Sequence, residues 1–148
     1  MNNIAWLLRH TPVFAVPGTG SYHVQPVHID DLTNICVEAA RPGPSTVIDA
    51  AGPETMSFDE LVRLIRGAAG ARALIVHVPA PAMALAARAV GLVMRDVVLT
   101  PDEIDGLMEG LLVSRDPPLG KIAFSGWIRN RGRSVGRTYA NELQRHFS

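Results

Sequence analysis

The amino-acid sequence predicts an α/β fold of α+β-like character, with a small sheet of three to four short strands and five to six helices. Short runs of β-branched and apolar residues alternate with longer segments of helical periodicity. Prolines and glycines bound most of these segments, as is typical of turns between elements. The length of 148 residues and the hydrophobic content of 47% indicate one domain over residues 1–148.

The first part of the chain is expected to form a helix, a short apolar run, a turn and a strand. These are residues 2–9, 13–16, 18–21 and 22–29, in that order. Asp30 or Asp31 is expected to cap the next helix, which runs to about Ala40, because a carboxylate accepts free backbone N–H groups. Cys36 falls on the apolar face of that helix, so the sequence predicts a buried, inert thiol.

Two further strands are expected at Ser45–Ala50 and Leu74–Val78. Between them, Ser57 and Glu60 have the spacing of a capping box, and the helix they begin is expected to end at Gly70. His77 alternates with apolar neighbours along the last strand, which predicts a place in the core.

The segment from Pro81 to Val93 is alanine-rich and has Arg88 as its one charged residue. A helix that is apolar on most sides is normally buried on most sides, and a chain this small offers little to cover it. We therefore expect a homodimer, or a larger closed assembly. The candidate self-association residues are Met83, Leu85, Val90 and Leu92.

Three helices are expected in the last third of the chain. Thr100 and Glu103 form a second capping box, with Pro101 at the first helical position, and this helix runs to about Val113. A short helix surrounds Trp127. The last helix is expected to span Ser134–Phe147.

The charge balance argues against a nucleic-acid-binding protein, because 14 basic and 14 acidic residues give a net charge of zero. From Arg115 onward, seven bases against two acids give a net charge of +5. Within that basic part, Arg129 and Arg131 lie between Trp127 and Tyr139, and guanidinium groups beside aromatic rings are candidate phosphate contacts. The competing interpretation is an exposed turn between two helices.

Other classes of protein have little support in the sequence. The single cysteine excludes an internal disulfide, and the five histidines form no zinc-type spacing. No Gly-x-Ser-x-Gly elbow is present. No secretory signal and no membrane span are expected, because the longest apolar region contains prolines, a histidine and an arginine. The expected location is cytoplasmic.

Several motifs occur along the chain in an order that resembles a known protein family. QPVHIDDLT, DAAGPE, MSFDELVRLI, VLTPDEIDGL, GWIRN and GRTYANELQRH follow one another along the chain. This order resembles the C-terminal, substrate-side portion of an extended or atypical short-chain dehydrogenase/reductase. The nearest resemblance is to NAD(P)-binding, epimerase-like proteins related to the 39 kDa subunit of respiratory complex I. It covers nearly the whole chain.

That family carries its dinucleotide on an N-terminal Rossmann half with a glycine-rich turn, and uses a Tyr-x-x-x-Lys pair for proton transfer. Gly18 and Gly20 are followed by His23 where the third glycine would fall, and a strand is expected there in place of a helix. No tyrosine precedes Lys121 at the required spacing. The resemblance therefore implies no cofactor on this chain, and NAD(P) only if a separate Rossmann chain exists.

The resemblance also implies a ligand cleft at the strand that ends in QPVHIDD. Sugar-nucleotide epimerases have an arginine in this strand that helps to hold the diphosphate, and Val24 takes its position here. His28 and Asp31 match the family pattern, whereas Gln25 and Pro26 replace an Asp-Tyr pair. The candidate cleft residues are Tyr22, Gln25 and His28, and the competing interpretation of His28 is a satisfied core histidine.

Three hypotheses of function remain open from the sequence. The first is a non-catalytic, self-associating domain derived from this family, which binds a small ligand or a protein partner. The second is half of a split NAD(P)-dependent epimerase or reductase that needs a separate Rossmann chain. The third is a protein-interaction module that docks through the apolar helix or the basic tail.

Overall fold

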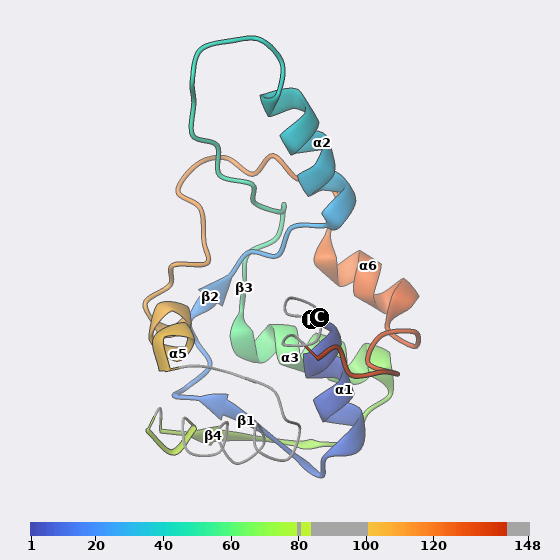
Figure 1. Ribbon diagram of the computed structural model, residues 1–148. Coiled ribbons are helices and arrows are strands. Elements are labelled where there is room, and N and C mark those ends of the chain that lie inside the picture. Colours follow the sequence, from blue (N-terminus) through green and yellow to red (C-terminus); the bar gives the residue numbers. More distant parts are fainter. Residues whose placement is uncertain (80, 84–100, 142–148) are drawn as a thin grey trace.

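A computed structural model describes residues 1–79, 81–83 and 101–141 (Figure 1). Its described elements are α1 (Asn2–His10), β1 (Val13–Pro17), β2 (His23–Val24), α2 (Ile29–Ala39), β3 (Met56–Ser57), α3 (Phe58–Ala69), β4 (Leu74–Val78), α5 (Pro101–Met108) and α6 (Phe124–Arg131). The predicted mixture of helices and short strands is confirmed. The described strands form two separate two-stranded sheets, in place of the single sheet that the sequence predicted.

The two sheets differ in the relative direction of their paired strands. β1 and β4 are parallel, with Val13 opposite Leu74 and Pro17 opposite Val78. Parallel neighbours require a long crossover, and here the connection contains β2, α2, β3 and α3. β2 and β3 are antiparallel and very short, with Val24 opposite Met56.

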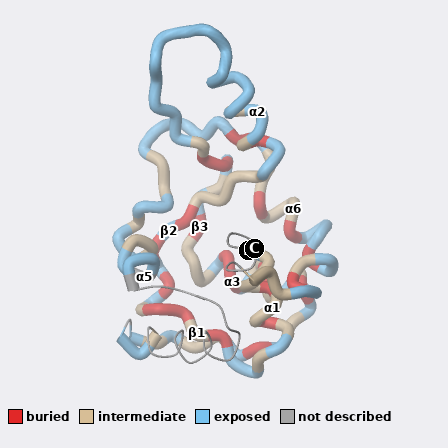
Figure 2. Tube along the Cα trace, viewed as in Figure 1, coloured by how far each residue is buried: buried red, intermediate tan, exposed pale blue. Residues whose placement is uncertain are grey.

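Helix α3 lies at the centre of the core, as the buried segments of Figure 2 show. Leu61, Val62 and Ile65 on α3 are fully buried. α1 packs against α3 with Leu8, and α6 packs against it with Ile128. Each such side chain contributes roughly 1.5–3 kcal/mol of hydrophobic free energy when it is fully buried.

The predicted boundaries of α3 are confirmed. The Ser57 hydroxyl accepts a hydrogen bond from the Glu60 backbone N–H at 3.2 Å, and Glu60 Oε2 accepts one from the Ser57 N–H at 2.8 Å. Gly70 ends the helix in the left-handed region, with φ of 66°. Both signals act within a few residues of sequence, which is why the sequence alone locates them.

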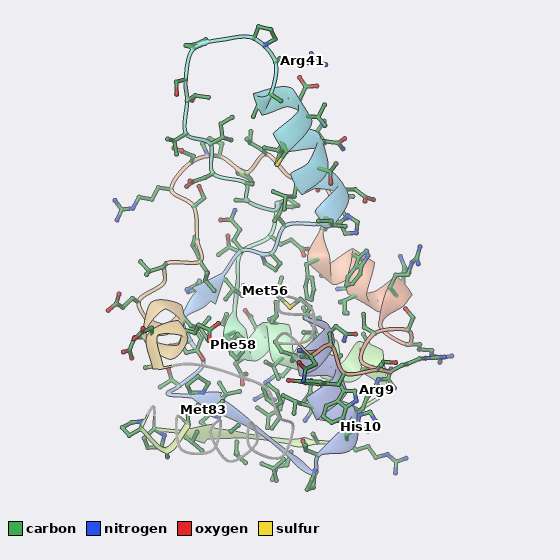
Figure 3. The ribbon with its side chains drawn as sticks, in the orientation of Figure 1. Arg9, His10, Arg41, Met56, Phe58 and Met83 are labelled. Atoms are coloured by element: carbon green, nitrogen blue, oxygen red, sulfur yellow. The ribbon has the colours of Figure 1, made fainter. Side chains whose placement is uncertain are left out.

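Residues 29–50, which we call the arm, project from the rest of the molecule (Figure 1). α2 buries Asp31 alone among its residues, and Cys36 is exposed, so the predicted buried thiol is wrong. Arg41 lies at the outer end of the arm, paired with Glu38 at 2.9 Å (Figure 3). The predicted strand at 45–50 is extended chain, because no described strand lies beside it to pair with its backbone.

The predicted strand from Tyr22 to Ile29 pairs only over His23–Val24. Two features end the ladder there. The Gln25 N–H donates to the Leu112 carbonyl at 3.0 Å, and Pro26 has no N–H to donate.

Helix α5 ends at Met108 and not near Val113, because Gly110 takes a φ of 75° and turns the chain. The predicted helix from Ser134 is wrong over its described part, 134–141, which is turn and irregular chain. The side chains of α1 hold this part instead. Arg9 donates to the carbonyls of Gly132, Arg133 and Val135 at 3.1–3.2 Å, beside the labelled His10 in Figure 3.

The predicted helix at 81–93 is helical over 81–83, and its remaining residues lie outside the described ones. Met83 lies near the end of β4 in Figure 3. Within the part of the chain that the structure describes, no helix combines the length and the apolar character needed to cross a bilayer.

Candidate ligand-binding site

The segment from Gln25 to Ile29 connects β2 to α2 and is fastened by the side chain of Gln25. The Gln25 amide nitrogen donates to the Gly52 carbonyl at 2.9 Å, and its Oε1 accepts from the Ser114 N–H at 3.0 Å. Each polar atom of the side chain therefore already has a protein partner. Gln25 joins three parts of the chain that are distant in sequence, and this role is structural.

Gly52 shows how closely these parts approach one another. A Cβ atom placed on Gly52 would lie 1.8 Å from the carbonyl oxygen of Pro26. At the preceding residue, Ala51, the backbone carbonyl accepts a hydrogen bond from the Gly120 N–H at 2.9 Å. No residue larger than glycine fits at position 52 without moving the backbone of the QPVH segment.

His28 begins α2, and the prediction that Asp30 or Asp31 caps this helix is wrong. His28 Nδ1 accepts a hydrogen bond from the Asp30 backbone N–H at 3.2 Å. Because Nδ1 accepts, the neutral ring carries its proton on Nε2. The ring meets the indole of Trp127 edge to face, with centroids 5.8 Å apart. Sequence reasoning missed this cap because histidine is not among the usual capping residues.

Asp31 is turned toward a different segment. Its Oδ2 accepts hydrogen bonds from the backbone N–H groups of Lys121 and Ile122, each at 2.8 Å. The bond from Ile122 is the main cause of a lowered pKa of the Asp31 carboxyl, and the bond from Lys121 acts in the same direction. Asp31 thus holds the base of the arm against the chain that leads into α6.

A cavity of about 390 Å³ lies between the start of α2 and α6, and we call it the His28 cavity. This volume is within the range of small-molecule sites, near its lower end. The imidazole of His28 and the indole of Trp127 are the polar groups among its side chains. The lining residues are Met1, Pro26, Val27, His28, Ile29, Ile122, Phe124 and Trp127.

A second cavity, of about 470 Å³, includes Gln25 and shares Pro26 with the first. It reaches Phe58 and the core residue Leu61. Asp49 and Ser114 make one side of this cavity polar, and Ser114 Oγ donates a hydrogen bond to Asp49 Oδ2 at 2.8 Å. We call this the Gln25 cavity. Pro26 therefore belongs to the walls of both cavities.

Tyr22 lines neither of these two cavities. It is 9% exposed, and its ring stacks on Phe58 with centroids 5.5 Å apart (Phe58 is labelled in Figure 3). Its hydroxyl has no hydrogen-bond partner among the described residues. Burial raises the pKa of this hydroxyl, and the carboxylate of Asp59 raises it further. The Tyr22 hydroxyl is therefore protonated and neutral at physiological pH.

The structure therefore separates the three predicted cleft residues. Gln25 and His28 line adjacent cavities on the two sides of Pro26, whereas Tyr22 packs beside Phe58. Sequence reasoning missed Ile122, Phe124 and Trp127. A signal was available, since Phe124 and Trp127 are three residues apart and so share one helix face.

The remaining predicted residues lie elsewhere. Arg129 lines an open groove beside α3 together with Arg133, whereas Arg131 is exposed and is not among the groove residues. Of the predicted self-association residues, Met83 is half-buried, and Leu85, Val90 and Leu92 lie outside the described residues.

His77 is exposed, so its predicted place in the core is wrong. Its Nε2 lies 3.0 Å from Asp59 Oδ1, and Arg63 donates to the same carboxylate. The hydrogen bond from Arg63 is the main cause of a lowered pKa of Asp59. This is an exposed ion-pair cluster. Over the described ranges, no three His, Cys, Asp or Glu side chains gather in a way that could hold a metal ion.

The described fold and cavities define a mixed α/β protein with two adjacent cavities at one strand–helix connection. No protein-family model matches this chain, and no curated protein matches it.

Proposed function

We propose that this chain is a binding domain derived from the short-chain dehydrogenases, not catalytic by itself, which self-associates and binds a small, mainly apolar ligand. The observation that carries the proposal is the His28 cavity, an apolar space of about 390 Å³ at the QPVHIDD segment. The chain lacks both the glycine-rich fingerprint and the Tyr-x-x-x-Lys pair. Binding without hydride transfer is the function that fits both facts.

The lining of the cavity indicates the class of ligand. Pro26, Val27 and Ile122 offer apolar surface, and Trp127 offers an aromatic face. Nδ1 of His28 already accepts from Asp30, so the Nε2–H is the donor that the ring can offer to a ligand. We therefore propose a compact apolar ligand that has one hydrogen-bond acceptor. A sugar nucleotide is disfavoured, because the described lining residues include no arginine or lysine.

The arm supports self-association. Ile29 is 64% exposed, Val37 is 59% exposed and Val47 is 95% exposed. Three large apolar side chains exposed on one projecting segment offer apolar surface that a second copy would bury. α2 makes no extensive contact with another described helix or strand, so its apolar side chains are available to a second copy. The predicted contribution of Met83 remains part of this proposal.

We also propose that the protein is located in the cytoplasm. Cys36 is an unpaired thiol on the exposed face of the arm. Unpaired exposed thiols persist in reducing compartments, whereas oxidising compartments convert them to disulfides.

Native mass spectrometry of the purified protein tests both parts of the proposal, because it reports subunit count and retained ligand in one spectrum. The expected result is a dimer with a small-molecule adduct. A clean monomer with no adduct, after purification under mild conditions, contradicts both parts.

Two variants test ligand binding and self-association separately. Val27→Phe fills the His28 cavity and is expected to remove the adduct while the dimer remains. Val47→Asp puts a charge on the arm and is expected to release monomers that keep the adduct. If Val27→Phe retains the adduct, the ligand binds elsewhere, and if Val47→Asp stays dimeric, the arm is not the interface.

One observation favours a second candidate, half of a two-chain NAD(P)-dependent enzyme. Within the described residues, β1 and β4 form a parallel sheet of two strands, and parallel sheets are normally larger and covered on both faces. A separate Rossmann chain would extend this sheet and bring the cofactor. Co-expression with a Rossmann chain that carries the glycine-rich fingerprint tests it. A stable heterodimer with NAD(P)H-dependent reductase or epimerase activity supports this candidate, and two chains that purify apart contradict it.

A further inference from the structure

An open groove of about 860 Å³ lies beside α3 and α6, on residues that take no part in the two cavities. We call it the α3–α6 groove. α6 lies alongside α3 in Figure 1. Close packing at one end comes from Gly132, where an added Cβ would lie 2.3 Å from the Ala68 Cβ. At Gly67, the residue before Ala68 on α3, an added Cβ would meet nothing within 4 Å, so the groove is open above this glycine.

The groove combines an apolar floor with basic walls. Leu64 and Gly67 of α3 form part of the floor, and Met56, labelled in Figure 3, adds to it. Arg63, Arg129 and Arg133 line the groove together with one acid, Glu60. The surface is therefore both apolar and positively charged.

Two of these arginines are available to a partner. Arg63 is paired with Asp59, and Glu60 accepts the hydrogen bonds of the Ser57 capping box. Arg129 and Arg133 make no ion pair in the described part of the chain. The hydrogen bonds from Ser125 are the main cause of the lowered pKa of Glu54, and the positive charge of Arg129 adds a smaller contribution. The groove thus presents two uncommitted guanidinium groups.

We propose that the α3–α6 groove binds an acidic segment of a partner protein, in which carboxylates alternate with apolar side chains. The carboxylates pair with Arg129 and Arg133, and the apolar side chains cover Leu64 and Met56. This function is separate from the His28 cavity and does not depend on it.

The geometry favours a peptide over the other anions. A single phosphate is best held in an enclosed nest of N–H donors, and this groove is open, with exposed arginines. Single-stranded nucleic acid needs aromatic rings for its bases, and the described lining residues include none. An extended peptide satisfies the charge and the apolar floor together.

The test uses fluorescence anisotropy with the full chain and a short labelled peptide that alternates Glu and Leu. The double variant Arg129→Glu/Arg133→Glu is compared with Arg131→Glu, which changes one exposed charge between these two positions but outside the groove. We expect the double variant to weaken binding by about tenfold and Arg131→Glu by less than about twofold, because the interaction depends on charges placed at the groove.

A second pair of variants leaves every arginine in place. Gly67→Glu puts a carboxylate on the floor, and Gly67→Gln puts a neutral side chain of the same shape there. Repulsion predicts a clear loss of peptide binding for Gly67→Glu and a smaller loss for Gly67→Gln. Equal losses for this pair contradict a site that selects acidic segments.

Several results overturn the proposal. They are the absence of binding to the Glu–Leu peptide, equal binding of a Gln–Leu peptide, and equal weakening by Arg131→Glu and by the double variant. Tighter binding of pyrophosphate or of a single-stranded oligonucleotide than of the peptide also overturns it, because it assigns the groove to a different ligand.

Discussion

The Oδ2 atom of Asp31 lies 2.8 Å from the backbone nitrogen of Ile122, 91 positions away in the sequence. The same oxygen accepts the N–H of Lys121, so one carboxylate fixes the base of the arm to the chain entering α6. The His28 cavity lies between these two segments, since Ile29 and Ile122 both line it. The shape of the proposed binding site therefore depends on this contact.

Replacing Asp31 by alanine removes the acceptor of two backbone N–H groups. We expect Asp31→Ala to lower the urea midpoint of unfolding, because these N–H groups lose a charged partner in a buried place. Asp30→Ala is the matched control, since its carboxylate is 73% exposed. Similar midpoints for the two variants would show that the Asp31 contact does not stabilise the fold.

Stability is expected to fall in acid. The pKa values of Asp31, Glu54, Asp59 and Glu60 are all lowered in the folded protein. Such carboxylates stabilise the fold fully above their unfolded pKa values, about 3.9 for Asp and 4.3 for Glu. This contribution is lost as the pH falls through the lower folded pKa values. Urea unfolding at a series of pH values should show the free energy of unfolding decreasing below about pH 4.

The same experiment on Asp31→Asn identifies the groups responsible. This variant keeps the shape of the side chain but does not titrate, so its free energy of unfolding should depend less steeply on pH in the acid range. An unchanged slope would assign the acid sensitivity to other groups.

Glu54 caps a helix from a distant part of the chain. The N-cap residue of α6, Ala123, has no side chain able to cap the helix. Glu54 instead accepts the Ser125 N–H at 2.7 Å and the Ser125 hydroxyl at 2.6 Å. Glu54→Ala is expected to cost about 1 kcal/mol of unfolding free energy, as for the loss of an N-cap. Ser125→Ala removes the hydroxyl bond alone and should cost less, by thermal or urea unfolding. The reverse order would contradict a capping role.

Two glycine-to-alanine changes should have opposite effects. Gly52→Ala places a Cβ 1.8 Å from the Pro26 carbonyl oxygen, so it is expected to displace the QPVH segment and destabilise the protein strongly. Gly67→Ala meets nothing within 4 Å inside α3 and should stabilise by about 0.5–1 kcal/mol through helix propensity. Thermal unfolding of both variants checks the pair. A Gly52→Ala protein of normal stability would contradict the close approach.

Cys36 reports on the arm. As an exposed thiol on α2, it should react rapidly with a thiol reagent in dilute protein without denaturant. If copies associate through the arm, raising the protein concentration should slow this reaction, and Val47→Asp should restore the fast rate. A slow reaction in monomeric Val47→Asp would contradict the exposure of Cys36.

Local signals were sufficient for some elements. The capping box at Ser57 and the left-handed Gly70 bound α3 as the sequence predicts, because each depends on residues within one helical turn. The apolar run at Leu74–Val78 forms a strand, as expected. His77 in that strand was misplaced, because alternation does not tell which neighbours cover each face, and Asp59 draws its ring to the surface.

The candidate site was only partly predictable. The sequence pointed to Gln25 and His28, and both line cavities. Their roles depend on partners that no local pattern indicates: Gly52 and Ser114 for Gln25, and Trp127 for His28. Arg133, which lines the α3–α6 groove, was likewise indistinguishable from Arg131 in the sequence.

The sequence by itself determined where α3 begins and ends, that Leu74–Val78 forms a strand, and that the glycine-rich fingerprint and the Tyr-x-x-x-Lys pair are missing. Only the tertiary structure decided that Asp31 holds Ile122, that Glu54 caps α6 and that Pro26 lies between two cavities. The physical reason is the range of the interactions. Caps and turns are settled by neighbours along the chain, whereas hydrogen bonds and cavities between distant segments exist only after the chain has folded.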